Sequence, residues 1–349
     1  MKRNFKSIMA IILGGAMILG ASGCASNNSS NAAVPAASSS AATDTQKASG
    51  ETVTLKFAHA DSDTSVFNQG ATAFKEKLEE LSSGQVKVEI YGNGQLGTLS
   101  DYAQGIQMGT IDVAPVSATV LANFAPSISV FDLPFLIETE QQAYNALDGD
   151  VGADLAAELE TNKMLCKGWW TLGYRNVTAS KEIQSVEDLK GLRIRTQNSE
   201  IHMKIFKALG VDATPMDFSE LFTALQQGTV DGQENPYSNI LNNNIFEVNN
   251  MLVDTGHVYQ VAGMLFSPST WDKLSSEQQA WVDEASAYAT GIERTACTDN
   301  NNSAKESLIK EHGMKFVELD KAQLQAATAS VYDEYPDLKE LADKVKSYK

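Results

Sequence analysis

An α/β fold of two lobes is the architecture that the sequence predicts, and three observations support it. Short stretches of alternating apolar residues are separated by helical patterns in both halves of the chain, which is typical of parallel sheets covered by helices. The segments 105–112 (GIQMGTID) and 224–231 (ALQQGTVD) both close a helical pattern and enter a strand, which suggests a common design for the two lobes. A helical pattern from Ser275 to about Lys310 is longer than one compact lobe needs, and it predicts a helix that spans both lobes.

The first 24 residues predict export from the cytoplasm. Three basic residues precede an uncharged apolar run at residues 8–19, which is typical of a signal peptide and too short for a membrane-spanning helix. The sequence Ala21-Ser22-Gly23-Cys24 resembles a bacterial lipobox, with alanine where leucine is usual. This similarity implies that residues 1–23 are removed and that Cys24 carries a diacylglyceryl group. Plain secretion with cleavage nearby is the alternative.

Composition predicts a tether followed by an acidic globular body. Residues 25–50 are almost entirely Ser, Ala, Asn and Thr, so this segment cannot form a core, and we expect residues 24–50 to be a lipidated flexible leash spanning roughly 25 to 30 Å. The remainder is long enough for two lobes. Without residues 1–23 the chain has 24 basic and 44 acidic residues, a formal charge of −20, which argues against nucleic acid as a partner.

In the first half of the globular body, the sequence predicts the order strand, helix, strand, helix, strand. Alternating apolar residues mark strands near residues 53–57, 86–90 and 111–113, and helical patterns at about 64–81 and 99–108 separate them. This βαβαβ order favours a parallel sheet with helices on its faces.

The second half repeats this plan. A strand at 192–196 is followed by a helix that Ser199 caps, and then by a strand at 211–214. A late strand at 315–319 and a terminal helix at 321–332 complete the predicted elements.

The segment 214–236 is the most informative part of the chain. Asp217 with Glu220 three residues later predicts an aspartate-type capping box at the start of a helix, and Gly228 stands where a left-handed residue is expected after the helix end. We expect residues 232–236 (GQENP) to form a polar loop at a sheet edge, a usual place for ligand contacts. An ordinary helix, strand and turn would also explain the segment.

Four residues are candidates for binding an organic acid. Arg195 ends a predicted strand at the sheet edge where open α/β sheets bind ligands, and its planar guanidinium matches a carboxylate; a surface salt bridge is the alternative. Arg175 lies where the chain passes between the predicted lobes. Asn235 offers a donor and an acceptor to a carboxylate or hydroxyl, and Phe218 could form a wall of a pocket or simply pack in the core.

The sequence contains no recognisable signature of catalysis. It has no GxSxG, no HExxH and no phosphate-binding Gly-rich loop. Asp217 with Glu220, or Glu234 alone, could serve a glycosidase as acid and base, but helix capping explains their spacing more simply. Cys166 and Cys297 can pair or stay free, since sequence does not fix their separation. We expect neither a metal nor a cofactor, and no metal-binding spacing joins the four histidines: His59, His202, His257 and His312.

Four motifs together give the chain a resemblance to a known family. They are residues 93–97 (NGQLG), 132–135 (DLPF), 189–195 (LKGLRIR) and 215–236. From Leu55 to about its end, the chain resembles the extracytoplasmic solute-binding proteins of tripartite ATP-independent periplasmic (TRAP) transporters, of the type that binds C4-dicarboxylates or sialic acid. Any one of these motifs would be weak evidence, whereas the combination is specific.

This resemblance implies a two-lobed periplasmic-binding-protein-like fold with a long helix strapping both lobes and a cleft that closes on a carboxylated solute. The implied division is residues 51–172 plus 261–300 for lobe I, and residues 173–260 plus 301–349 for lobe II. We expect a monomer.

The resemblance also assigns roles to individual residues. Arg195 matches the family arginine that grips the solute carboxylate, and Arg175 matches a second arginine found in many members. Asn235 matches the asparagine of the cleft, and Phe218 matches its aromatic wall. Two further residues fall on cleft-lining segments that vary between members: His59 and Ser117.

The expected function is therefore binding without catalysis. We expect a lipid-anchored extracytoplasmic protein that delivers an organic acid to the integral-membrane subunits of a TRAP permease. The polar loop, with Gly and Ser near the cleft, favours sugar acids such as uronates over C4-dicarboxylates. Two alternatives remain open: a secreted polysaccharide hydrolase, and a solute sensor for a membrane kinase.

Overall fold

A computed structural model describes residues 52–349 of the chain. The predicted signal peptide, Cys24 and the 24–50 tether lie outside the described residues, so the expectations for them stay predictions. Among the helices of residues 52–349, none combines the length and the apolar character that crossing a membrane requires.

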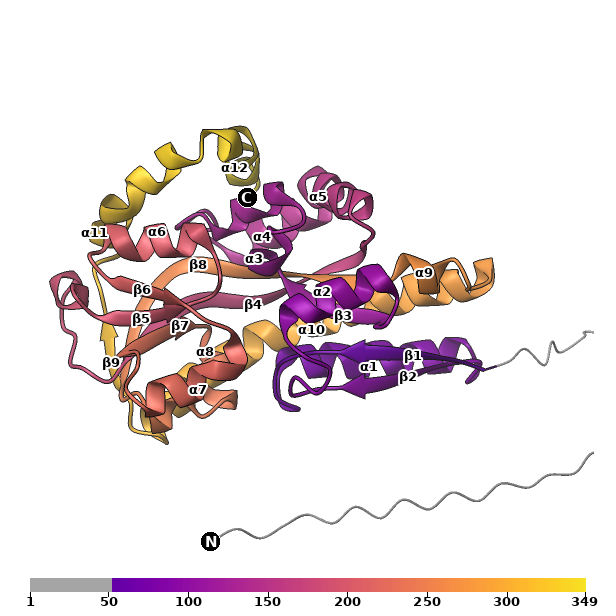
Figure 1. The fold of residues 1–349 in the computed structure, drawn as a ribbon, viewed down its shortest axis with the longest axis horizontal. Helices are drawn as coiled ribbons and strands as arrows, with labels where there is room; N and C mark the ends of the chain where they lie inside the picture. The colour runs from indigo at the N-terminus through magenta and orange to yellow at the C-terminus, as the bar shows by residue number, and fades with distance from the viewer. Residues whose placement is uncertain (1–51) are drawn as a thin grey trace, which may run out of the picture. The chain divides into compact units, whose positions relative to one another are not determined.

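One mixed sheet of nine strands organises the described residues, in the order β2-β1-β3-β8-β4-β7-β5-β6, with β9 paired to β8 (Figure 1). Two long antiparallel strands, β4 and β8, lie in the middle of this order, and short parallel strands lie on both sides. The strands are β1 (Val53–Ala58), β2 (Val86–Tyr91), β3 (Val113–Ser117), β4 (Leu165–Ala179), β5 (Arg193–Thr196), β6 (Asp212–Pro215), β7 (Gly232–Asn235), β8 (Met251–Phe266) and β9 (Lys315–Glu318).

Helices cover this sheet and connect its parallel strands. The α-helices are α1 (Val66–Leu81), α2 (Leu99–Met108), α3 (Ala118–Leu121), α4 (Glu140–Asp148), α5 (Asp150–Thr161), α6 (Glu200–Ala208), α7 (Phe218–Gln226), α8 (Tyr237–Asn242), α9 (Pro268–Trp271), α10 (Ser276–Lys310), α11 (Lys321–Thr328) and α12 (Lys339–Ser347). Short 3-10 helices are η1 (Pro126–Asp132), η2 (Val186–Leu189), η3 (Ile245–Glu247), η4 (Ala329–Glu334) and η5 (Pro336–Leu338).

The predicted βαβαβ order of the first half is confirmed. Strand β1 pairs in parallel with both β2 and β3. Helix α1 begins after Ser65, whose side chain accepts a hydrogen bond from the backbone N–H of Asn68. Helix α2 begins with a capping box between Thr98 and Asp101, which satisfies backbone donors that a helix start leaves free. Local capping signals therefore fix where these helices start.

Strands β4 and β8 are absent from the sequence-based prediction. They pair antiparallel over almost their whole length, with register shifts at Cys166/Gly168, Thr171/Gly173 and Arg175/Val177. Most residues of both strands are buried, so neither shows the alternation that marks a half-exposed strand. Each of the two strands also pairs with a neighbour on its own side of the sheet order, β8 with β3 and β4 with β7.

The prediction of a polar loop at residues 232–236 is wrong, because residues 232–235 form the buried strand β7 between β4 and β5. The polar side chains are tolerated because each has a buried partner. Gln233 donates to Thr178 Oγ1 over 3.0 Å, and Glu234 pairs with Arg175. At Gly232 a Cβ atom would lie 2.1 Å from the carbonyl oxygen of Thr178, so no side chain fits. Residues 232–235 have the composition of a loop, but hydrogen-bond partners far away in the sequence allow them to be buried in the core.

The predicted capping box at Asp217 is also wrong. Asp217 is the N-cap of α7, but its side chain caps no backbone N–H. The backbone N–H of Glu220 instead donates to the carbonyl oxygen of Asp217 over 3.2 Å, so this donor is already satisfied. The predicted left-handed residue after the helix is confirmed, since Gly228 has φ +66°.

The similarity between GIQMGTID and ALQQGTVD is confirmed as a structural repeat. In each copy, the threonine N–H donates over 2.9 Å to a carbonyl five residues earlier, from Thr110 to Gly105 and from Thr229 to Ala224. The aspartate that closes each copy then accepts a hydrogen bond from a backbone N–H of the neighbouring parallel strand. These bonds are Lys56 N to Asp112 Oδ2, 2.8 Å, and Arg193 N to Asp231 Oδ2, 2.9 Å.

Helix α10 contacts both groups of strands, as predicted. It begins after the capping Ser275 and runs for 35 residues, which corresponds to about 52 Å. Its first part, including Val282 and Ala289, packs with α1 and Trp170 in one apolar core. Its last part, Ala304 and Leu308, packs with α7 and α8 in another.

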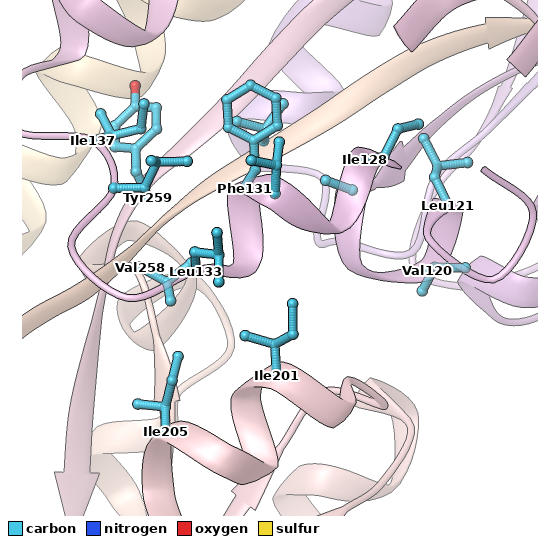
Figure 2. Packing of buried hydrophobic residues seen from close by; sticks show 14 of the residues in the cluster. Val120, Leu121, Ile128, Phe131, Leu133, Ile137, Ile201, Ile205, Val258 and Tyr259 are labelled. Carbon is cyan, nitrogen blue, oxygen red and sulfur yellow. The ribbon is translucent and has the colours of Figure 1, made fainter. Parts of the chain in front are cut away.

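A third apolar cluster joins segments that are distant in the sequence (Figure 2). Ile201 and Ile205, on the predicted apolar face of α6, lie close to Leu133 from the DLPF motif and Val258 from β8. All four side chains are buried. The motif therefore holds α6 against the central strands.

The C-terminal segment differs from the single predicted helix at 321–332. Helix α11 ends at Thr328, 3-10 turns follow, and α12 packs against α4 and α5 (Figure 1). Lys344 forms salt bridges of 2.9 and 3.0 Å to Asp150 and Asp154 of α5. The two remaining cysteines are free, Cys297 being fully buried.

Candidate functional site

A cavity of about 560 Å³ lies where strands from both parallel groups end. Its size is that of a typical site for a small metabolite. Residues at or just beyond the carboxyl ends of β1, β3 and β5 contribute to its wall, as expected for open α/β sheets. Polar lining residues include Asp61, Ser117, Arg175, Arg195, Gln197, Asn198, Asn235, Asn239 and Gln260; apolar ones include Phe67, Leu172, Met216, Phe218 and Phe222.

Arg195 supplies a buried positive charge to this cavity. Its side chain is 2% exposed, and its Nε and Nη2 donate to the carbonyl oxygen of Met216 over 2.9 and 2.6 Å. Nη1 is buried and has no hydrogen-bond partner among residues 52–349. Burial, with the nearby Arg175, lowers the pKa of Arg195 to about 10 against the influence of Glu234, so the side chain is a cation at neutral pH.

Arg175 is held in a different way, because its guanidinium is already paired. Glu234 accepts from Nε and from Nη2, the latter over 2.8 Å, and Gln260 accepts from Nη1. Although burial alone would raise it, the pKa of Glu234 is held well below its usual range by Arg175 and His257. The charges of Arg175 and Glu234 therefore neutralise each other, which leaves Arg195 as the cavity cation without a salt bridge in the part of the chain that the structure describes.

Two histidines extend this buried ion pair away from the cavity. His257 Nε2 donates to Glu234 over 3.2 Å, since a carboxylate can only accept, and its Nδ1 accepts from Thr255 over 2.8 Å. His202 lies between Glu234 and Asp132, with 3.3 Å from its Nε2 to Asp132 Oδ1. The pKa of Asp132 stays below its usual value despite burial because His202, Thr119 and Ser199 stabilise its carboxylate.

We expect the free energy of unfolding to fall as the pH drops from 7 to 5. Burial lowers the pKa of His257 below its usual 6.5, so protons bind the unfolded chain more readily. The contribution of neutral His257 to the free energy of unfolding is complete above pH 6.5. It is lost as the pH falls below that value, by up to about 2 kcal/mol at pH 5. Denaturant unfolding at several pH values measures this slope. The slope should flatten in a His257→Gln variant, and an equal slope in both proteins would contradict the assignment.

A chain of hydrogen-bonded polar side chains leads from the Arg175–Glu234 ion pair to Ser117. Gln197 donates to Gln260 Oε1 over 2.8 Å and accepts from the hydroxyl of Ser117 over 3.3 Å. Gln260 in turn accepts from Arg175. Ser117 stands at the end of β3 and Gln197 just beyond β5, so these hydrogen bonds connect the two parallel groups of strands.

Five of the six predicted site residues line the cavity: Ser117, Arg175, Arg195, Phe218 and Asn235. The ring centroid of Phe218 lies 5.9 Å from Arg195 Cζ, within cation–π range. Asn235 is buried, and its amide donates to Gln233 within β7. His59 is fully buried and is not among the lining residues; its Nε2 lies 3.1 Å from Asn68 Oδ1.

Several polar lining residues are absent from the sequence-based prediction. Asp61 and Gln197 lie just beyond the carboxyl ends of β1 and β5, so the rule that selected Arg195 would have found them. Gln260 offered no such signal because it lies inside the unpredicted strand β8. Asn239, on α8, becomes recognisable only through its contact with Asp61.

Comparison with protein families gives a match over almost the whole described chain. Residues 57–339 match the family described as bacterial extracellular solute-binding protein, family 7. A solute-binding protein from Verminephrobacter eiseniae is 36% identical over 74% of this chain and 77% of its own length. The 2,3-diketo-L-gulonate-binding periplasmic protein YiaO of Escherichia coli is 32% identical over 75% and 80%.

Solved structures show the same fold. A TRAP periplasmic solute-binding protein from Bordetella bronchispeptica matches with a TM-score of 0.82 and 36% identity, over 85% of this chain and 99% of that one. DctPAm of Advenella mimigardefordensis, solved with galactonate, matches with a TM-score of 0.83 and 31% identity, over 85% and 97%. A relative from Sulfurospirillum deleyianum with bound succinate matches at 0.81 and 28%, over 86% and 100%.

These matches confirm the two-lobed periplasmic-binding-protein-like fold with its long strapping helix. They also show that the chain is an extracytoplasmic solute-binding protein rather than an enzyme, of the TRAP kind that serves a membrane permease. The chain therefore belongs to family 7 of the bacterial extracellular solute-binding proteins, the periplasmic solute-binding proteins of TRAP transporters.

Proposed function

We propose that this protein binds a sugar acid in the cavity and delivers it to a TRAP-type permease. The observation that carries the proposal is the buried guanidinium of Arg195, whose Nη1 has no partner among the described residues. A buried donor without a partner is costly, and a solute carboxylate would remove that cost through a charge-assisted hydrogen bond. The solute carboxylate is therefore assigned to Arg195.

Charge and hydrogen bonding favour a sugar acid over a dicarboxylate. Relatives bind both classes, since DctPAm was solved with galactonate and the Sulfurospirillum protein with succinate. In this chain Glu234 neutralises Arg175, which leaves a single guanidinium free to meet a single carboxylate. The side-chain amides of the cavity wall can donate and accept, which suits a row of hydroxyl groups: Gln197, Asn198, Asn235, Asn239 and Gln260.

We propose that Phe218 forms an apolar wall beside the carboxylate and that Asn235 and Ser117 contact the polar part of the solute. In this arrangement Arg175 acts through Gln260, because its own donors are occupied by Glu234. We further propose a cleft between lobe I (51–172 plus 261–300) and lobe II (173–260 plus 301–349). The Ser117–Gln197 hydrogen bond, which would cross that cleft, supports this division.

Lipidation of Cys24 is part of the same proposal. The lipobox-like sequence and the polar segment behind it would hold the binding protein near its permease while leaving it free to turn. Metabolic labelling with a palmitate analogue tests this step, because a Cys24→Ala variant should lose the label.

A thermal-shift screen tests the choice of solute. The panel contains D-galactonate, D-glucuronate, succinate, N-acetylneuraminate and 2-oxobutyrate, each near 1 mM. A ligand at one hundred times its Kd stabilises the folded state by about 2.7 kcal/mol, enough for a shift of several degrees. We expect the sugar acids to give the largest shifts. Stabilisation by succinate alone would overturn the sugar-acid assignment, and no shift with any carboxylate would overturn the carboxylate site.

A further inference from the structure

Asp61 is a second buried charge in the cavity, and the function proposed above does not use it. The residue lies just beyond the carboxyl end of β1, is 6% exposed and lines the cavity. Its Oδ1 accepts a hydrogen bond from Asn239 Nδ2 over 3.0 Å. Among residues 52–349, no other side chain donates to it and no cation forms a salt bridge with it. Burial raises the pKa of Asp61, against the opposing influence of His59 and Asn239.

The other buried acidic groups beside the cavity are compensated, whereas Asp217, which also lines it, is exposed to solvent. Glu234 is paired with Arg175, and Asp132 accepts hydrogen bonds from Thr119 and Ser199 next to His202. Asp61 thus has a position like that of Arg195, with opposite sign. Each is buried at the cavity wall with bonding capacity left over, since Arg195 Nη1 has no partner and Asp61 accepts a single side-chain hydrogen bond among residues 52–349. Such groups are costly to bury unless a ligand completes their hydrogen bonds.

The charges of Asp61 and Arg195 come from strands on opposite sides of the central pair β8-β4. In the strand order, β1 and β5 lie on opposite sides of the central pair β8-β4. The cavity therefore has a cationic contact contributed by one parallel group and an anionic contact contributed by the other. A ligand that satisfies both must present a carboxylate to Arg195 and hydrogen-bond donors to Asp61.

We propose that Asp61 makes the site selective for acids with a single carboxylate, by accepting hydrogen bonds from hydroxyl groups of the solute and by repelling a second carboxylate. The inference rests on the proposed function, since it takes Arg195 as the carboxylate contact. Hydroxyl groups fit better than an ammonium group, because the amides around the cavity also need partners that both donate and accept. A second carboxylate would lie beside Asp61 with little water to screen the repulsion.

A matched pair of ligands isolates this effect. D-Galactonate and galactarate have the same carbon chain and differ only at C6, which is a hydroxymethyl group in the first and a carboxylate in the second. Calorimetry gives the ratio of their Kd values for the wild-type protein and for Asp61→Asn, which keeps the shape of the side chain and the acceptor for Asn239. Asp63→Asn is the control, because Asp63 is an exposed acid two residues away that does not line the cavity.

We expect the wild-type protein to prefer galactonate over galactarate by at least tenfold. Asp61→Asn should lower this preference at least tenfold, whereas Asp63→Asn should leave it unchanged. If the wild type prefers galactonate and Asp61→Asn keeps the full preference, the role of Asp61 is overturned while the proposed function stands. An equal change in Asp63→Asn would also overturn it, because a general charge effect would explain the result. Wild-type preference for galactarate would overturn the selectivity for a single carboxylate, while the proposed binding of a sugar acid at Arg195 would stand.

Discussion

Replacing Arg195 with alanine will abolish detectable solute binding. Among residues 52–349, Arg195 is the one cation lining the cavity that has no salt bridge, and because it is buried its attraction for a carboxylate is weakly screened. Truncating one partner of such a buried pair costs about 2 to 5 kcal/mol, which corresponds to roughly 30-fold to several thousand-fold in Kd. Isothermal calorimetry with the best ligand of the thermal-shift panel measures the change.

Two further variants distinguish charge from geometry. Arg195→Lys keeps the charge but cannot present two parallel N–H groups, so we expect it also to weaken binding strongly. Arg193→Ala is the matched control, because Arg193 lies on the same strand but is 44% exposed and pairs with Asp231 outside the cavity. Its affinity should stay within about twofold of the wild type. Unchanged affinity in Arg195→Ala would remove this residue from the site.

Replacing Glu234 with alanine will strongly destabilise the fold. Glu234 is fully buried, and its removal leaves the guanidinium of Arg175 charged and partly unpaired in the core. Breaking a buried ion pair on one side typically costs about 3 to 5 kcal/mol. The free energy of unfolding from denaturant titrations measures the loss, and Glu234→Gln, which keeps a hydrogen-bond acceptor, should lose less.

Controls for this prediction come from the same pair and from the surface. The double variant Arg175→Met/Glu234→Leu should recover part of the loss, because it removes both charges together. Glu334→Ala disrupts an ion pair with Lys204 that is roughly half exposed, and it should cost less than about 1 kcal/mol. A loss of similar size for Glu234 and Glu334 would mean that the buried pair does not hold the central strands together.

Local signals predicted much of the fold. The βαβαβ order, helix α10 and the repeat around Gly109 and Gly228 were all recognisable, because alternation, capping residues and left-handed glycines act within a few residues. The predicted side-chain cap at Asp217 is wrong because the backbone carbonyl of Asp217, and not its side chain, accepts the hydrogen bond from the N–H of Glu220.

Long-range pairing explains what the sequence did not predict. Strands β4 and β8 are buried along most of their length, so the alternation that would mark them is missing. Strand β7 has the composition of a loop, and it is core only because Arg175 and Thr178 of β4 pair with its polar side chains. No local pattern contains that information.

In the candidate site too, local signals predict some residues, whereas contacts between distant segments are not predicted. Arg195 and Phe218 were found from their places at a strand end and a helix start, and both line the cavity. The sequence marks the motif that contains Glu234, but the pairing of Glu234 with Arg175 follows only from the fold. Asp61, which follows a strand end, lines the cavity without having been predicted, whereas the predicted His59 is buried and does not line it.

The uninterrupted strands β4 and β8 have a mechanical consequence. Both contribute side chains to the cavity and also hydrogen-bond to the strands on either side of it. A change of angle between those sides must therefore bend the paired strands β4 and β8, and the register shifts along them are local irregularities in the pairing at which bending is easier. We therefore expect strands β4 and β8 to bend elastically, with the long helix α10 stiffening them. Little chain entropy is then lost when the sides approach a solute.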